Sequence, residues 1–302
     1  MVTIKKKLIG TREYYYLQHT VRTKKGVQTK EKYIGTQIPR NIEKLRRDFL
    51  TQIYKERWYP VLDKIRANYS EERHKIPKSA FEKHIRTFSV KFTYDTSRIE
   101  GSKLTYRETA DLLERGLTPR AKPLDDIKEA EAHEKVFYDM LECEKELSLQ
   151  LVLRWHEKLF GETKRDIAGI VREHQVAISG SRFMPPSPIE VQPMLREFFR
   201  WYNKNREKLH PVEFAASVHL KFVTIHPFAD GNGRMSRLLM NFVLQKHGFP
   251  LLNIPYENRG SYYSALERSQ VKKNDSIFIQ WFFKRYVKER KSYAGDRRQT
   301  LG

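Results

Sequence analysis

The chain has 302 residues, enough for one large domain or two small ones, and its 39% hydrophobic and 12% aromatic content argues against wholesale disorder. With 58 Lys and Arg against 37 Asp and Glu, the formal net charge of +21 is consistent with an acidic partner, whether nucleotide, nucleic acid or membrane surface. The single cysteine, Cys143, excludes an internal disulfide framework and a zinc site built from cysteines.

No part of the sequence has the character of a membrane segment. The basic start lacks an apolar run of signal-peptide length, and no stretch approaches the ~20 apolar residues that span a bilayer. Together with the single thiol, this predicts a soluble, cytoplasmic protein with no membrane partner.

The first segment, residues 1–47, is strongly basic. It holds thirteen Lys and Arg against three Glu, a net charge of +10, whereas residues 48–283 together carry +6 and residues 284–302 carry +5. Aromatic and β-branched residues around a turn at Lys24, Lys25 and Gly26 predict two or three short antiparallel strands. Such a sheet would bind nucleic acid through its tyrosines and lysines. Alternatively, it is a small solvated sheet whose lysines protect an exposed edge.

Helical periodicity begins near Ile42, is interrupted over 169–188 and resumes from Ile189 through the end. We divide this region into N-terminal helices over 48–110 and a catalytic core over 111–285, followed by a basic tail over 286–302. The interruption, 169–188, carries a turn-forming Ser-Gly-Ser between two extended runs and predicts a short β-hairpin.

The chemistry is concentrated between two predicted helices. The first ends at His226, because Pro227 disfavours helical geometry in the residue before it. A glycine-rich loop follows, in which Gly231 and Gly233 let backbone N–H groups converge on an anion at the start of the next helix. Asp230 offers the oxygen ligand that Mg²⁺ takes beside phosphate.

Three more side chains complete a candidate phosphate-transfer site. Arg234 and Arg237 lie on neighbouring positions of the second helix and would reach phosphates, while His226 can act as a base near neutral pH. Each feature alone is typical of a structural histidine, a turn or a solvated helix face. Together they match the pattern H-x-F-x-[DE]-G-N-G-R-x-x-R at all eight specified positions of 226–237.

This stretch resembles the active-site motif of the Fic family, enzymes that mostly transfer AMP from ATP to a protein hydroxyl. The resemblance covers roughly residues 75–285. It includes 169–188, similar to the family's target-docking flap, and Tyr262 to Leu266, similar to its segment near the adenine. It implies a mainly α fold, a Fic-type helical bundle with a short β-hairpin flap, preceded here by the small basic antiparallel β segment.

The resemblance also implies roles for individual residues. His226 would deprotonate the target hydroxyl, Phe228 would anchor the loop, and Asp230 would hold Mg²⁺ on the α- and β-phosphates of ATP. The phosphates themselves would be bound by an anion hole of Gly231, Asn232 and Gly233, by Arg234 at the β-phosphate and by Arg237 at the γ-phosphate. The residues implied around the rest of the nucleotide are Val176, Ala177, Ile178, Ser179, Tyr262, Tyr263 and Gln270, the last standing where some relatives have asparagine.

A second motif lies upstream. Thr96 and Glu100 are four residues apart on one face of a predicted helix over about 90–101, which Gly101 would end. Taken alone, residues 96–101 are typical of an ordinary helix end, but they resemble the family's inhibitory [ST]-x-x-x-E-[GN] motif. That resemblance implies that Glu100 pairs with Arg237 and occupies the space of the γ-phosphate.

Two functions follow from these observations. The first is a protein adenylyltransferase that is autoinhibited by Glu100 and that, like some related proteins, could also remove AMP from a target. The resemblance implies that the target protein docks at 169–188 and that the protein, as related proteins often do, forms a homodimer. The alternative is a nucleic-acid-binding regulator that acts through residues 1–47 and the basic tail, with a largely silent Fic core.

Overall fold

The computed structural model describes residues 2–23 and 26–295 and divides the chain into two compact units, Met1–Lys64 and Ile65–Gly302. Helices predominate, and a small antiparallel sheet precedes them in the chain, which confirms the predicted mainly α fold class. Lys24 and Lys25 of the predicted turn, and the predicted tail from residue 296 onward, lie outside the described residues. Within the described ranges, no helix has both the length and the apolar character to cross a bilayer.

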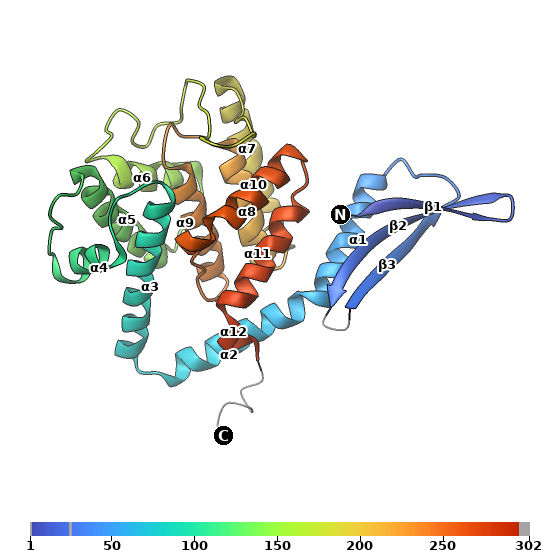
Figure 1. The fold of residues 1–302 in the computed structure, drawn as a ribbon, viewed down its shortest axis with the longest axis horizontal. Helices are drawn as coiled ribbons and strands as arrows, with labels where there is room; N and C mark the ends of the chain where they lie inside the picture. Colours follow the sequence, from blue (N-terminus) through green and yellow to red (C-terminus); the bar gives the residue numbers. More distant parts are fainter. Residues whose placement is uncertain (1, 24–25, 296–302) are drawn as a thin grey trace. The chain divides into compact units, whose positions relative to one another are not determined.

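The first unit is a three-stranded sheet with a helix on one face (Figure 1). Its elements are β1 (Thr3–Ile9), β2 (Arg12–Thr23), β3 (Gly26–Gly35) and α1 (Ile42–Arg57). The strands are antiparallel in the order β1-β2-β3. Alternate residues of β2 point toward the helix, so that Leu17 and Val21 form a core with Phe49 and Ile53. Because α1 supplies half of this core, the unit extends to Lys64, beyond the predicted 1–47 segment.

The second unit is helical, with α8 and α9 side by side at its centre (Figure 1). Its helices in chain order are α2 (Tyr59–Lys75), which begins in the first unit, α3 (Lys78–Ile99), α4 (Tyr106–Arg115), α5 (Leu124–Glu142), α6 (Leu149–Phe160), α7 (Pro188–Asn205), α8 (Pro211–Ile225), α9 (Asn232–Lys246), the 3-10 turn η1 (Tyr256–Asn258), α10 (Arg259–Val271), α11 (Ser276–Glu289) and α12 (Lys291–Ala294).

The central pair is held by burial on nearly all sides. Helix α8 starts with Pro211 in its first turn, where the missing N–H costs nothing, and most of its residues through Ile225 are buried. Helix α9 is buried to the same degree and contacts α3 and α5, while α8 contacts α7 and α11. Because both helices are enclosed by their neighbours, the loop that joins α8 to α9 is held at both ends.

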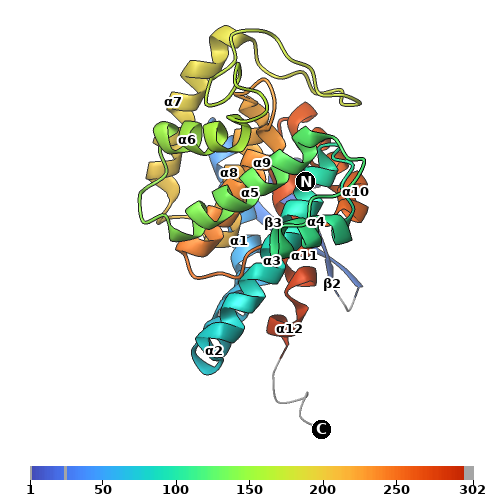
Figure 2. The same ribbon diagram turned by 90° about the vertical axis from the view of Figure 1, so that its left-hand side faces the viewer.

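The predicted β-hairpin over 169–188 is wrong. Figure 2 shows the connection between α6 and α7 as a long extended loop, and its described residues contain no strand. The prolines at 185, 186 and 188 have no N–H to donate to a ladder. Side chains close the loop instead: Gln175 Nε2 donates to the carbonyl of Pro185 at 3.1 Å, and Arg172 donates to that of Pro186 at 2.6 Å.

Candidate active site

The loop between α8 and α9 begins at His226, which ends α8 in the left-handed region with φ of 52°. A non-glycine residue there is strained and must be held by its surroundings. Arg172 does so, since its Nε donates to the His226 carbonyl at 2.8 Å and its backbone N–H donates to the Pro227 carbonyl at 2.9 Å. The Arg172 side chain is itself only 4% exposed.

The orientation of the His226 ring leaves one nitrogen available as a base. Nδ1 lies 3.2 Å from the carbonyl oxygen of Val223, an acceptor, so Nδ1 carries the proton and Nε2 keeps its lone pair. Burial lowers the pKa of His226 below its usual value, assisted by the charge of Arg172. The imidazole is therefore neutral at neutral pH, as a general base requires.

A reciprocal clamp holds the middle of the loop. The Phe228 N–H donates to Oδ1 of Asn232 at 2.9 Å, and Nδ2 of Asn232 donates back to the Phe228 carbonyl at 2.8 Å. The Phe228 ring is fully buried and stacks on His156 at 3.7 Å between ring centroids. The predicted anchor thus lies in the core, and the Asn232 side chain fastens the loop, leaving its backbone N–H for an anion.

His156 fixes the next residue of the loop from α6. Its Nε2 lies 3.0 Å from the carbonyl oxygen of Asp230, and its Nδ1 accepts the Gly169 N–H at 2.9 Å. One ring nitrogen donates and the other accepts, so a neutral imidazole satisfies both bonds. Gly231 packs so closely on Phe160 that a Cβ at this position would overlap the phenyl ring, and its φ of +80° also favours glycine.

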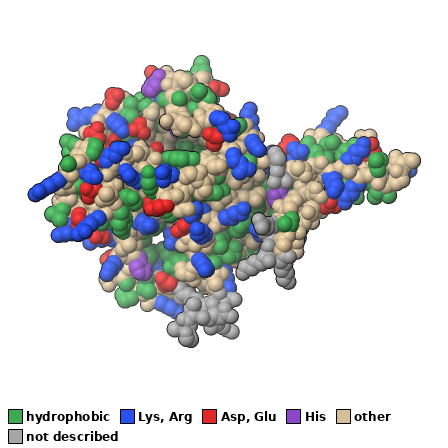
Figure 3. Space-filling view, in the orientation of Figure 1, with side chains coloured by type: hydrophobic (Ala, Val, Ile, Leu, Met, Phe, Trp, Pro, Cys, Tyr) green, Lys and Arg blue, Asp and Glu red, His purple; other side chains and the backbone are tan. Residues whose placement is uncertain are grey.

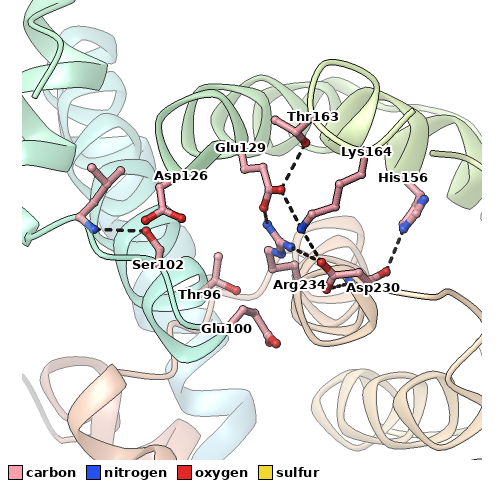
Figure 4. Close-up of polar contacts among 12 residues, drawn as sticks. Thr96, Glu100, Ser102, Asp126, Glu129, His156, Thr163, Lys164, Asp230 and Arg234 are labelled. Carbon is pink, nitrogen blue, oxygen red and sulfur yellow. Dashed lines mark hydrogen bonds and ion pairs between the residues drawn. The ribbon is translucent and has the colours of Figure 1, made fainter. Parts of the chain in front are cut away.

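The Asp230 carboxylate lies in a cluster of charges (Figure 4). Lys164 Nζ is 2.6 Å from its Oδ2, Arg234 is 3.7 Å from the same oxygen, and the Gly231 N–H donates to Oδ1 at 2.6 Å. Glu129 of α5 joins the cluster by pairing with Arg234 and, at 3.0 Å, with Lys164. Burial would raise the pKa of Asp230, but Arg234 and Lys164 hold it below its usual value, so the carboxylate stays ionised.

A Mg²⁺ ion that takes most of its ligands from phosphates and water needs as few as one carboxylate ligand from the protein. Asp230, ionised and two-fifths exposed, fits that role, although Lys164 already contacts one of its oxygens. Among the described residues, no three His, Cys, Asp or Glu side chains gather at one point.

Arg237 is the second buried cation of the motif, with 1% exposure. Its Nε donates to Thr96 Oγ1 at 2.6 Å, one terminal nitrogen donates to the Thr96 carbonyl at 3.1 Å, and the same nitrogen pairs with Glu100 Oε1 at 2.6 Å. The other terminal nitrogen donates to the Tyr262 hydroxyl at 3.3 Å. The structure therefore brings Thr96 and Glu100, at the end of α3, onto the motif.

Glu100 also covers the start of α9. A Cβ placed on Gly233, the second residue of that helix, would overlap Glu100 Oε1. The N–H groups in the first turn of a helix have no acceptor within the helix, and the dipole there favours an anion. The Glu100 carboxylate thus lies between the N-terminus of α9 and the Arg237 guanidinium.

The residues predicted around the rest of the nucleotide are only partly brought together. Tyr262 is buried beneath the motif, with its hydroxyl 3.0 Å from His219 Nε2, and Tyr263 is half-exposed, with its hydroxyl donating to the Ile99 carbonyl at 2.9 Å. Gln270 donates to Thr224 Oγ1 at 3.2 Å. The predicted contacts over 176–179 lie on the extended loop, where they are half-buried or exposed.

Sequence reasoning missed Glu129, Lys164, His156 and Arg172. They lie 54 to 105 residues before the motif partners that they contact. Each is a common residue type in an unremarkable local context, so no spacing signal could have identified them. Tertiary packing brings them to the site: α5 contacts α9, and α6 and the loop after it contact the loop between α8 and α9.

Known proteins are similar to part of this sequence and to its fold. Residues 146–244 match the Fic/DOC family, which confirms the predicted resemblance. The chain is 34% identical over 194 residues to the relatives named protein adenylyltransferase Fic in Drosophila ananassae and Drosophila melanogaster. Those residues are 63% of this chain and 37% of each relative, so the chain spans little more than a third of their length.

Solved structures of Fic proteins have a similar fold. Part of Fic-1 from C. elegans superimposes with a TM-score of 0.70 at 26% identity, covering 83% of this chain and 75% of that one. A Fic domain containing signaling protein from Bacteroides thetaiotaomicron has the same TM-score of 0.70 at 24% identity, covering 78% of this chain and 95% of its own. The second likeness is one of fold.

The buried histidine beside Asp230 predicts a pH-dependent stability. Burial lowers the pKa of His156 to about 4, with the bond to Asp230 opposing this only in part, against ~6.5 in an unfolded chain. The unfolded state therefore binds the proton first as the pH falls. The stability that the neutral, buried His156 contributes is complete above pH 6.5 and is lost as the pH falls toward 4. It amounts to about 3 kcal/mol.

Urea unfolding at several pH values measures this effect. We expect His156→Gln to be less stable than wild type at pH 7 and to lose less of its unfolding free energy between pH 6.5 and 4. Parallel pH profiles for the two proteins would contradict the assignment of this titration to His156.

Proposed function

We propose that the protein transfers AMP from ATP to a hydroxyl side chain of a target protein. The observation that carries this proposal is the arrangement of the motif: a neutral His226 with a free Nε2 stands at one end of a rigid loop, and the N-terminus of α9 with two buried arginines stands at the other. The similarity to relatives named protein adenylyltransferases supports the same reaction.

The chain's own groups account for the chemistry. Nε2 of His226 accepts the proton of the target hydroxyl, whose oxygen attacks the α-phosphorus. The bond from that phosphorus to its bridging oxygen breaks, and pyrophosphate leaves with the electron pair. N–H groups at the start of α9 stabilise the charge that develops, and Arg234 and Arg237 hold the leaving phosphates.

Mg²⁺ bound at Asp230 would neutralise phosphate charge during this transfer. Within the chain, Asp230 is kept ionised and in place by the Gly231 N–H, by Arg234 and by the His156 bond to its carbonyl. These contacts prepare the carboxylate before any cation arrives, which lowers the reorganisation that the reaction requires.

The resting protein is autoinhibited by Glu100 in this proposal. Its carboxylate stands on the N-terminus of α9 and on Arg237, the two features that would receive the γ-phosphate. Two anions cannot share one guanidinium and one helix end without strong repulsion. ATP would bind with its terminal phosphate displaced and its α-phosphate out of line with the target hydroxyl.

The partners and the direction of the reaction are proposals of the same kind. The extended loop over 169–188 borders the motif through Arg172, which bonds to both His226 and Pro186, and this supports target docking there. Removal of AMP from a target, and the homodimer predicted from the resemblance, stay predictions.

Replacing Glu100 tests both the activity and the brake. With [α-³²P]ATP, Mg²⁺ and cell lysate, we expect wild type to label proteins weakly and Glu100→Gly to label them at least tenfold more strongly, because the γ-phosphate gains its site. Glu114→Gly, a matched change near the end of α4, should behave as wild type.

Two further reactions separate the possible failures. Adding His226→Ala to Glu100→Gly should abolish labelling, since the base is lost. Incorporation from [γ-³²P]ATP instead would show phosphorylation and overturn AMP transfer, whereas a Glu100→Gly protein as silent as wild type would overturn the brake.

The ammonium of Lys164 predicts a changed Mg²⁺ requirement. It contacts Oδ2 of the Asp230 carboxylate that would hold the cation, and an ammonium and a divalent cation ~4 Å apart repel by ~8 kcal/mol at an effective dielectric constant of 20. The Lys164 side chain is 35% exposed, so solvent and movement reduce this figure. We expect Lys164→Met in the Glu100→Gly background to lower the half-maximal Mg²⁺ concentration about tenfold, a change of ~1.4 kcal/mol.

The comparison is with Lys128→Met, which removes a lysine of similar exposure that pairs with Glu162 rather than Asp230. It should leave the Mg²⁺ titration of label transfer unchanged. A Lys164→Met protein that needs as much Mg²⁺ as its parent would show that the ammonium does not compete at Asp230.

A further inference from the structure

The sheet of the first unit has a second face, opposite α1, on which no element within the described part of the unit packs. Directly paired residues of neighbouring strands point to the same side of a sheet. The register pairs Lys5 with Tyr16, Lys7 with Tyr14 and Tyr16 with Tyr33. These five residues form what we call the lysine–tyrosine face.

The three tyrosines of this face lie together. The rings of Tyr14 and Tyr33 are 6.1 Å apart and those of Tyr16 and Tyr33 are 5.3 Å apart, both tilted. Tyr33 is 49% exposed, and Lys7 Nζ lies 4.5 Å from the centre of the Tyr16 ring. An aromatic cluster left this open on a sheet presents π-surface and phenol groups to a ligand.

Charge indicates what kind of ligand fits. Residues 1–47 carry a net charge of +10, and Lys5 is exposed and makes no ion pair within the described residues. The acid on this side, Glu31, is already paired with Lys7 at 2.5 Å. Figure 3 shows Lys and Arg side chains beside hydrophobic ones, a class that includes tyrosine there, on the visible side of this unit.

We propose that the lysine–tyrosine face binds single-stranded nucleic acid. Bases stack on Tyr33 and its neighbours, and backbone phosphates contact Lys5 and Lys7, the combination that sequence-tolerant single-strand binders use. A duplex keeps its bases stacked inside and offers the tyrosines no base to receive. A solvated edge would need lysines but not clustered, half-exposed rings. This inference does not depend on the transferase chemistry, because its residues all lie in the first unit.

The sequence offers a matched pair of lysines for the test. Lys5 belongs to the lysine–tyrosine face, whereas the next residue, Lys6, pairs across the sheet with Tyr15 and bonds to Glu13 on the opposite side. Lys5→Ala and Lys6→Ala therefore remove the same charge from opposite faces. Tyr33→Phe keeps the aromatic ring, and Tyr33→Leu keeps apolar bulk without it.

The experiment measures fluorescence anisotropy of a labelled 20-nucleotide DNA strand, and of its duplex, with the full chain at several salt concentrations. We expect the single strand to bind more tightly than the duplex, with affinity falling as salt rises. Tyr33→Leu should weaken single-strand binding roughly 5- to 150-fold, the range for loss of one stacked base, while Tyr33→Phe retains it. Lys5→Ala should reduce both the affinity and the salt slope more than Lys6→Ala does.

Three results would overturn the proposal. They are duplex binding as tight as single-strand binding, equal affinities for Tyr33→Leu and Tyr33→Phe, or equal effects of Lys5→Ala and Lys6→Ala. Thermal unfolding of each variant identifies any that has lost its fold. The Phe and Leu variants differ little in volume, so their comparison remains decisive even if both are slightly destabilised.

Discussion

The Arg237 guanidinium, buried to 1% exposure, is the constraint on which the second unit depends. Arg237 cannot lose its charge, and a buried charge without partners costs several kcal/mol. Thr96, Glu100 and Tyr262 supply the partners, and they bind α3 and α10 to the central helix α9. Of these partners only Glu100 carries a full negative charge, and it is the one that a phosphate could replace.

The remaining contacts of the motif serve rigidity. Asn232 and Phe228 hold each other through two hydrogen bonds, His156 holds the Asp230 carbonyl, and Arg172 holds the strained His226 backbone. Arg234 is balanced separately by Glu129, so the two arginines of the motif have different counter-charges. The site is therefore preorganised except at Glu100, whose side chain is 28% exposed and can move without unpacking a core.

Much of this could be predicted from the sequence, because the information was local. Pro227 fixed where α8 ends, the glycines indicated the loop, and the four-residue step from Thr96 to Glu100 placed both on the side of α3 that contacts Arg237. Glu129, Lys164 and His156 could not be found in this way, because their roles arise from tertiary packing. The predicted hairpin over 169–188 failed for a local reason, since prolines in its second arm cannot donate the ladder's hydrogen bonds.

The claim that Glu100 holds the place of the γ-phosphate is tested most directly by comparing the affinities of ADP and ATP with Mg²⁺ by titration calorimetry. In wild type the third phosphate finds its site taken, so the account predicts that ATP binds no more tightly than ADP. In Glu100→Gly, ATP should bind at least tenfold more tightly than ADP. A wild-type protein that already prefers ATP by the same factor as Glu100→Gly would contradict the account.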